Sequence, residues 1–243
     1  MGLATVNFYI IELYPNPIKT LSNRDVVSSN HRVDEGVKVE AFTKLFEDGS
    51  AVVNRCVVGD LDNNVYIVTS KSTGESILID AADEGDYLEE FAKALKVRTV
   101  LETHGHYDHI GAVEHLRDAG FEVVVGKEDA FLLPSYDLLA ADGEAYEFGG
   151  LTIENISTPG HTDGSFCFYL HGSNFLFTGD TLFPGGPGAT HFPGGNFGKI
   201  MDSLTDRLFN RFSDDVIILP GHGRYTTFGS ERPHLEEWAL RGD

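Results

Sequence analysis

Short apolar runs, some continuous and some alternating with polar residues, follow one another along the chain after residue 36. Continuous runs bounded by turn residues predict buried strands, and alternation predicts strands with one solvent-facing side. Apolar residues three or four positions apart predict helices. The expected strands are 37–45, 52–58, 64–69, 76–80, 97–101, 151–156, 165–170, 174–178 and 216–219, and the expected helices are 87–95, 113–119 and 199–212.

The order of these elements predicts an α/β fold of packed layers. Up to residue 80 the chain is expected to contain strands without helices, and after residue 80 strands alternate with helices. Two strand-rich halves would then each pack against helices. With 243 residues and 41% hydrophobic content, the chain can bury one substantial core. We expect one domain over residues 37–243.

Residues 1–36 differ from the rest. The apolar stretch 6–13 is interrupted by Asn7 and Glu12, which argues against a signal peptide or a membrane span. Residues 15–36 are polar and contain Pro15 and Pro17. We expect an N-terminal arm or loop that covers a sheet edge or contacts a second subunit of a homo-oligomer.

Charge and cysteine content narrow the function classes. The formal net charge is -20, with 18 basic against 38 acidic residues, which weighs against a nucleic-acid partner. The two cysteines, Cys56 and Cys167, offer no disulfide framework and no C-x-x-C spacing. A cytoplasmic protein acting on a small molecule, without membrane or nucleic-acid contacts, is the expectation.

The segment 103–109, Thr-His-Gly-His-Tyr-Asp-His, carries the strongest chemical signal. It follows the predicted strand 97–101 and precedes a helical pattern from Ile110 onward. Alternate residues of an extended segment face the same way, so His104 and His106 can bind one ion while Asp108 and His109 turn toward another. The loop predicts half of each of two metal sites.

Further ligand-type residues follow later strands, each within a glycine-containing turn. They are His161, Asp180 and His222. Imidazole and carboxylate are ligands that zinc accepts, and no packing role needs these residue types at repeated strand ends. The other histidines lack such partners, and we expect His115 to have no role in metal binding.

The motif H-x-H-x-D-H, followed in order by G-H, G-D and G-H, resembles the metallo-β-lactamase-fold hydrolases over about residues 52–238. The stretches 158–162, 178–183 and 219–223 are similar to the glyoxalase II branch. Residues 226–232 are similar to the T-x-x-G-x-E-R that closes its small single-domain members. The resemblance implies a four-layer αββα sandwich.

The resemblance also implies a ligand set. It assigns His104, His106 and His161 to a first divalent ion, Asp108, His109 and His222 to a second, and Asp180 to both. Asp80 matches an aspartate that supports the segment 103–109, here called the metal loop, without binding metal. Zinc is the default ion, and iron and manganese are the alternatives.

The implied chemistry is hydrolysis of a thioester or related acyl bond, as in hydroxyacylglutathione hydrolases. Two ions sharing one water lower its pKa from about 15.7 toward about 7, so that a bridging hydroxide is the nucleophile. Asp108 is expected to orient that nucleophile and take its proton.

The loop 185–196 departs from its relatives. It resembles a G-x-G-R-T-D-F-P-x-G-D stretch, but Ala189 replaces Arg, His191 replaces Asp and Asn196 replaces the final Asp. His191 is therefore a candidate catalytic residue that donates to a substrate carboxylate or thiolate, with a plain surface residue as the alternative.

Other functions stay open. The chain ends soon after Arg232, without the helical domain with which larger glyoxalase II enzymes bind glutathione. Lactones and β-lactams suit the same chemistry, because a fold does not choose its substrate. A mononuclear iron oxidoreductase of the persulfide dioxygenase type and a non-catalytic metal-binding module are the alternatives from other classes.

Overall fold

Two mixed β-sheets carry the fold in the computed structural model, which describes residues 42–242. The predicted arm, residues 1–36, lies outside the described residues. No helix within 42–242 combines the length and apolar character needed to cross a bilayer.

The first sheet has seven strands in sequence order. They are β1 (Thr43–Glu47), β2 (Ala51–Val58), β3 (Asn63–Ser70), β4 (Ser76–Ile79), β5 (Val97–Leu101), β6 (Glu122–Gly126) and β7 (Leu138–Ala140). The first four pair antiparallel and β4 to β7 pair parallel. Parallel neighbours need crossovers, and α1 (Gly85–Ala94), α2 (Val113–Asp118) and the 3-10 helix η1 (Ala130–Leu132) lie within them.

The second sheet has the order β15-β14-β11-β10-β9-β8. Its strands are β8 (Ala145–Phe148), β9 (Leu151–Ser157), β10 (Phe166–Leu170), β11 (Phe175–Gly179), β14 (Ile217–Pro220) and β15 (Thr226–Thr227). Only β11 and β14 pair parallel. The chain between them forms the ribbon β12 (Leu182–Phe183) and β13 (Gly186–Pro187), then α3 (Phe197–Asp202) and the π-helix η2 (Ser203–Phe209). The chain continues after β15 with α4 (Phe228–Glu231), the 3-10 helix η3 (Arg232–His234) and α5 (Leu235–Arg241).

Alternation along single strands produces the layers. On β11, Phe175 and Phe177 pack into a core shared by both sheets, whereas Leu176 packs on the other side with Leu204 and Trp238. Successive side chains of a strand point to opposite faces, so a continuous apolar strand is buried on both.

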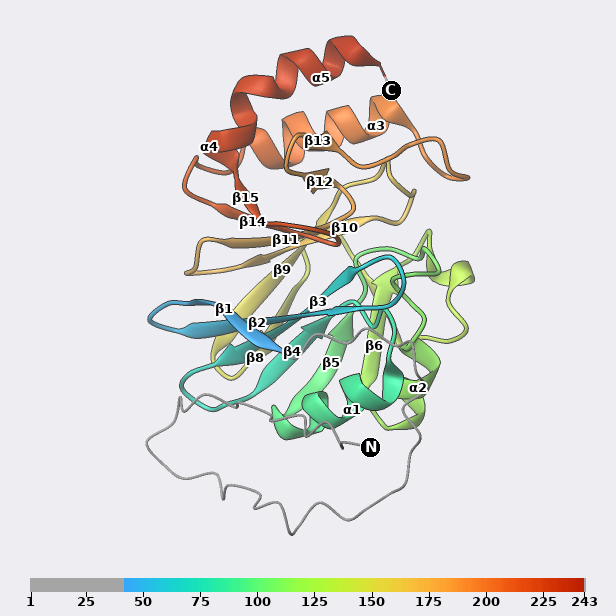
Figure 1. Ribbon diagram of the computed structural model, residues 1–243, viewed down its shortest axis with the longest axis vertical. Helices are drawn as coiled ribbons and strands as arrows, with labels where there is room; N and C mark the ends of the chain where they lie inside the picture. The colour runs from blue at the N-terminus through green and yellow to red at the C-terminus, as the bar shows by residue number, and fades with distance from the viewer. Residues whose placement is uncertain (1–41, 243) are drawn as a thin grey trace, which may run out of the picture. The chain divides into compact units, whose positions relative to one another are not determined.

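A third core lies on the outer side of the first sheet, where Leu88 of α1 and Leu116 of α2 pack against Leu78 of β4. Three cores separate four layers, with α1 and α2 outside one sheet and α3 and α5 outside the other (Figure 1). The predicted αββα sandwich is confirmed.

Candidate metal centre

The predicted ligands of the two sheets meet because their strands end near one another. His104 to His109 follow β5 of the first sheet, and His161, Asp180 and His222 follow β9, β11 and β14 of the second. The strand β3 reaches the same edge, where Asn63 bridges to His222 and Asn64 N donates to Gly221 O at 2.7 Å. Each sheet therefore contributes part of one centre.

A first group consists of His104, His106 and His161. One ring nitrogen from each lies within 4.8 Å of the others, and His104 Nε2 is 3.1 Å from His106 Nδ1. His104 and His161 are buried and His106 is half-buried. The three imidazoles converge on one point, as ligands of a single ion would.

A second group consists of Asp108, His109 and His222. Its ligand atoms also lie within 4.8 Å of one another, and His222 Nε2 is 3.3 Å from both His109 Nε2 and Asp108 Oδ2. A Cβ on Gly221 would lie 2.3 Å from Asp180 Oδ1 and 2.7 Å from His109 Cε1. Glycine is required before His222 because the backbone passes directly against the ligands.

Asp180 faces both groups. Its Oδ1 lies 3.5 Å from His109 Nε2, and its Oδ2 lies 3.6 Å from both His161 Nε2 and His222 Nε2. One carboxylate therefore has an oxygen within reach of an ion in each group.

Contacts on the outer ring nitrogens orient three of the imidazoles. His161 Nδ1 lies 2.7 Å from Ala189 O, His222 Nδ1 lies 2.9 Å from Leu61 O, and His109 Nδ1 lies 3.0 Å from Asp80 Oδ2. A carbonyl or carboxylate oxygen only accepts, so Nδ1 donates in each case and the Nε2 lone pair points to the centre. Such contacts typically fix the tautomer and orientation of metal-binding histidines.

Asp80 supports the metal loop from beneath. Its carboxylate accepts hydrogen bonds from Thr103 N at 2.7 Å, Thr103 Oγ1 at 2.9 Å and His109 Nδ1. Its φ of 63° lies in the left-handed region, which costs energy for a residue other than glycine. The following Ala81 N donates to the fully buried Glu102 at 3.1 Å. Glu102 thus fixes the turn that presents Asp80.

The sequence patterns did not reveal Glu102, Asn63 or Asp129 as parts of this region. Asn63 Nδ2 donates to Asp108 Oδ2 at 2.9 Å. The buried Asp129 accepts from Gly105 N at 2.8 Å, Thr162 Oγ1 at 2.6 Å and Gly164 N at 2.9 Å. In the sequence, these residues appear only as polar residues near the ends of apolar strand patterns. Turns have the same appearance, so the pattern alone does not identify residues that support the centre.

Charge within the centre is unevenly distributed. Burial lowers the pKa of His104 well below its usual value, so this imidazole is neutral. Burial also acts to lower the pKa of His109, but the carboxylates of Asp180 and Asp80 outweigh it and raise that pKa well above the usual range. The carboxylates therefore favour positive charge beside His109 Nε2, which either a proton or a metal ion bound to that nitrogen would supply.

The side chains present fit divalent ions. His161 Nε2 and Asp180 Oδ1 are buried atoms without a hydrogen-bond partner among the described residues. Buried polar atoms are nearly always paired, so both atoms call for a partner that accepts their lone pairs, as a metal ion does. Neutral imidazole nitrogen with carboxylate oxygen is a donor set that zinc, iron and manganese accept.

His191 is not among the side chains that converge on the centre. Its side chain is exposed and stacks on Phe192 with ring centroids 4.2 Å apart, and Phe192 lies 5.8 Å from the His106 ring. His191, Ala189 and Asn196 border a cavity of about 800 Å³ that Arg241 also lines. His191 is thus a neighbour of the metal loop through Phe192 and no member of either ligand group.

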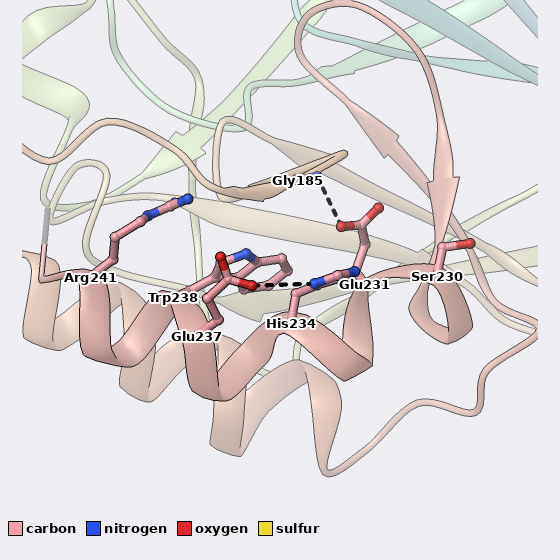
Figure 2. Close-up of a pocket in the computed structure, with 7 residues that line it drawn as sticks. All are labelled: Gly185, Ser230, Glu231, His234, Glu237, Trp238 and Arg241. Carbon is pink, nitrogen blue, oxygen red and sulfur yellow. Dashed lines mark hydrogen bonds and ion pairs between the residues drawn. The ribbon is translucent and has the colours of Figure 1, made fainter.

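Two other polar clusters lie apart from the centre. His115, with Asp86 and Glu89, belongs to a group on the surface of α1 and α2, where its Nε2 lies 2.6 Å from Glu89 Oε2. A pocket of about 370 Å³ lies beside α5, where Glu231 accepts from Gly185 N and His234 pairs with Glu237 (Figure 2). Neither cluster contains a predicted ligand.

Comparison with known proteins identifies the family. The model of the metallo-β-lactamase superfamily matches residues 58–222, which include every predicted ligand. The chain belongs to the metallo-β-lactamase superfamily. It is a metal-dependent hydrolase, and the fold implies divalent metal ions.

Individual members of the superfamily show the range of similarity. Hydroxyacylglutathione hydrolase GloC of Haemophilus influenzae is 34% identical over 199 residues, 74% of this chain and 89% of that protein. The BLEG-1 B3 metallo-β-lactamase has a TM-score of 0.70 at 24% identity, covering 76% and 99% of the two chains, and shares the fold. TTHA1623, solved in a di-iron-bound form, has a TM-score of 0.62 at 28% identity, covering 72% and 95%.

Proposed function

We propose that the chain is a dinuclear hydrolase of a thioester or related acyl bond, with chemistry like that of hydroxyacylglutathione hydrolases. The observation that carries the proposal is the position of Asp180, whose two oxygens face two groups of three ligands. The similarity to the Haemophilus influenzae hydroxyacylglutathione hydrolase supports the choice of bond.

In this proposal each group would hold one divalent ion, and an oxygen of Asp180 would be available to each. The first set is His104, His106 and His161, and the second is Asp108, His109 and His222. Bound ions would supply a nucleophile at neutral pH by lowering the pKa of a water, and would polarise the substrate carbonyl. Zinc is our first choice for both.

Asp108 is proposed as the residue that orients the nucleophile and takes its proton. Asn63 Nδ2 holds Asp108 Oδ2 at 2.9 Å, and the side chain is 14% exposed, so it can reach a substrate as well as an ion. His191 is proposed to contact the substrate from the neighbouring loop.

Two further expectations complete the proposal. We place the enzyme in the cytoplasm because both cysteines are unpaired and buried. Residues 1–36 are proposed as an arm on a single hydrolase domain. Their deletion should change stability or mass in solution, and an unchanged protein would remove that role.

Elemental analysis beside a hydrolysis screen tests the function. The screen contains S-lactoylglutathione, neutral thioesters, lactones and nitrocefin. We expect about two ions per chain and turnover of the thioesters. One iron per chain, with oxygen uptake on a persulfide and no hydrolysis, would replace the proposal with the oxidoreductase alternative. Turnover of nitrocefin or of lactones, without turnover of thioesters, would show that the enzyme hydrolyses a different bond from the one proposed.

A further inference from the structure

We propose that Asp129 is a positioning residue that holds the first metal site together across the two sheets. The inference rests on the proposed function, because it concerns His104, His106 and His161 as ligands. Asp129 lies just after β6 of the first sheet, and it binds two loops that carry these ligands.

The contacts of Asp129 are specific to those loops. Its Oδ2 accepts from Gly105 N, the backbone amide between His104 and His106. The same oxygen accepts from Thr162 Oγ1, directly after His161, and Oδ1 accepts from Gly164 N. One buried carboxylate therefore fixes two ligands of the first sheet relative to the ligand of the second.

Local packing brings this carboxylate directly against Gly164. A Cβ on Gly164 would lie 2.6 Å from the carboxylate carbon, Oδ1 and the backbone nitrogen of Asp129. Residue 164 must be glycine for the carboxylate to approach both loops. No contact of the Asp129 carboxylate among the described residues reaches the second group, so its effect should be confined to the first.

The test measures metal affinity in backgrounds that isolate each site. In a His222→Ala background, Asp129→Asn should lower the affinity for the remaining zinc ion about 10–100-fold, since partners that orient ligands typically have effects of this size. In a His161→Ala background the same change should leave zinc affinity unchanged. Zinc competition with a chromogenic chelator gives the affinities without a substrate.

Control variants separate positioning from general destabilisation. Asp137→Asn removes a carboxylate that binds Val123 N, near the start of β6, and Arg117, and zinc affinity should stay unchanged. Should Asp129→Asn fail to fold, Thr162→Val removes one of its three donors and should weaken zinc binding by a smaller factor. Unchanged zinc affinity in the His222→Ala background for every variant would overturn the inference, whereas a wild-type protein that binds no metal would overturn the proposed function.

A different observation points to the substrate class. We propose that the acyl group of the substrate is apolar and packs on an apolar rim made of Tyr107, Phe131, Leu132 and Phe192. All four side chains are exposed, Phe131 by 81% and Tyr107 by 76%. Exposed apolar groups gathered at one place typically mark a binding surface.

Two side chains of the rim, those of Phe192 and Leu132, lie against the loop that carries His104 and His106. Tyr107 lies between His106 and Asp108 in the sequence, and the Phe192 ring lies 5.8 Å from that of His106. Leu132 packs against the metal loop, where a Cβ on Gly105 would lie 2.9 Å from Leu132 Cδ1. We therefore expect the acyl group of a substrate bound at this site to meet these side chains.

Charge disfavours an anionic substrate here. Residues 103–112 and 183–197 contain no lysine or arginine, Ala189 stands where the related pattern has Arg, and Arg241 is the single lysine or arginine among the residues that line the neighbouring cavity. The net charge of -20 repels anions at long range. The apolar part of a neutral thioester suits this entrance better than glutathione does.

Thioesters that share one thiol test the rim. Acetyl and hexanoyl thioesters of N-acetylcysteamine, and S-lactoylglutathione, are compared by kcat/KM. Hexanoyl should exceed acetyl at least about tenfold, since each buried CH₂ strengthens binding, and Phe192→Ser or Phe131→Ser should narrow that gap through KM. Leu240→Ser, a change at an exposed leucine of α5, is the matched control and should not. Equal kcat/KM values for the acetyl and hexanoyl thioesters, or a preference for S-lactoylglutathione, would overturn the proposal that the rim binds the acyl group. No turnover of any thioester would instead overturn the proposed function.

Discussion

The two ligand groups of the centre differ in their exposure and in the residues that hold them. The first group, with His104 and His161 buried and His106 half-buried, is joined across the sheets by Asp129 and by Ala189 O. The second group contains the fully buried His109, which Asp80 holds, but its other two ligands are partly exposed, with side-chain exposure of 25% at His222 and 14% at Asp108. Preorganised ligands lose less conformational entropy on binding, so the first group should bind its ion more tightly.

The difference assigns separate work to the two groups. In the proposed function the first group should retain its ion and align the loop 103–109, whereas the partly exposed Asp108 of the second group should meet the substrate. Asp180 couples the groups because it faces both.

Replacing Asp180 should have the largest effect. Asp180→Ala removes an oxygen from each group, so both ions should be bound more weakly and turnover should fall at least about 10³-fold, about 4 kcal/mol of activation free energy. Thioester hydrolysis and elemental analysis measure both quantities. His115→Ala should change neither, and retained turnover in metal-free Asp180→Ala protein would contradict the scheme.

Removing one histidine from each group should give unequal results. After dialysis against a weak chelator, His222→Ala should keep about one ion per chain because the first group is intact. His161→Ala should lose its ions at a chelator concentration at least about tenfold lower, a difference of about 1.4 kcal/mol. The comparison is wrong if His161→Ala retains metal better than His222→Ala.

Asp80 should matter for both stability and the second group. Asp80→Asn leaves at least one of the donors at Thr103 and His109 without its acceptor, which costs about 1–3 kcal/mol of unfolding free energy for a buried group. Urea unfolding of the metal-free protein measures this cost. Asp83→Asn is an exposed control nearby and should cost much less. Equal stability of the two variants would remove Asp80 as a support.

Glu154 on β9 should show the smallest effect, and only on stability. Hydrogen bonds from Arg211, at 3.0 and 2.6 Å, hold the pKa of Glu154 below its usual value. A lowered folded pKa adds stability above the unfolded pKa of about 4.3, and this is lost as the pH falls through the folded pKa. Glu154→Gln should therefore be less stable by about 0.5–1 kcal/mol at pH 7.

Unfolding free energies at pH 7 and below pH 4 check this sign, since the difference between wild type and Glu154→Gln should shrink at the lower pH. A difference that grows with acid would contradict it. Metal content should not change, because Glu154 pairs with His171 and Arg211 and with no ligand.

The fold was predictable where single strands carry strong patterns. Residues 97–101 and 216–219 correspond to β5 and β14, and the helix 87–95 corresponds to α1. Shorter or polar elements escaped prediction: β8, with exposed residues alternating with half-buried ones, and the two-residue strand β15 have little periodicity. The helix 199–212 is α3 followed by a π-helix, because local hydrophobic spacing does not distinguish helix types.

The candidate ligands were predictable for a related reason. His104 and Asp180 each follow an apolar strand within a recognisable motif, so local sequence identifies them. Asp129 acts on residues 24 to 35 positions away, and Asn63 acts on Asp108 across 45. Such contacts depend on how strands are ordered in the sheets, which the sequence of a single segment does not encode.

Stepwise removal of metal from the wild-type protein tests the difference between the two groups most directly. The protein is loaded with zinc and titrated with a chelator, while bound zinc, thioester hydrolysis and unfolding temperature are followed. We predict that about two ions per chain are released in two steps. Hydrolysis should be lost in the first step, and most of the decrease in unfolding temperature should occur in the second step. A single ion per chain under zinc excess, or release of both ions in one step, would contradict the claim that the first group binds its ion more tightly than the second group.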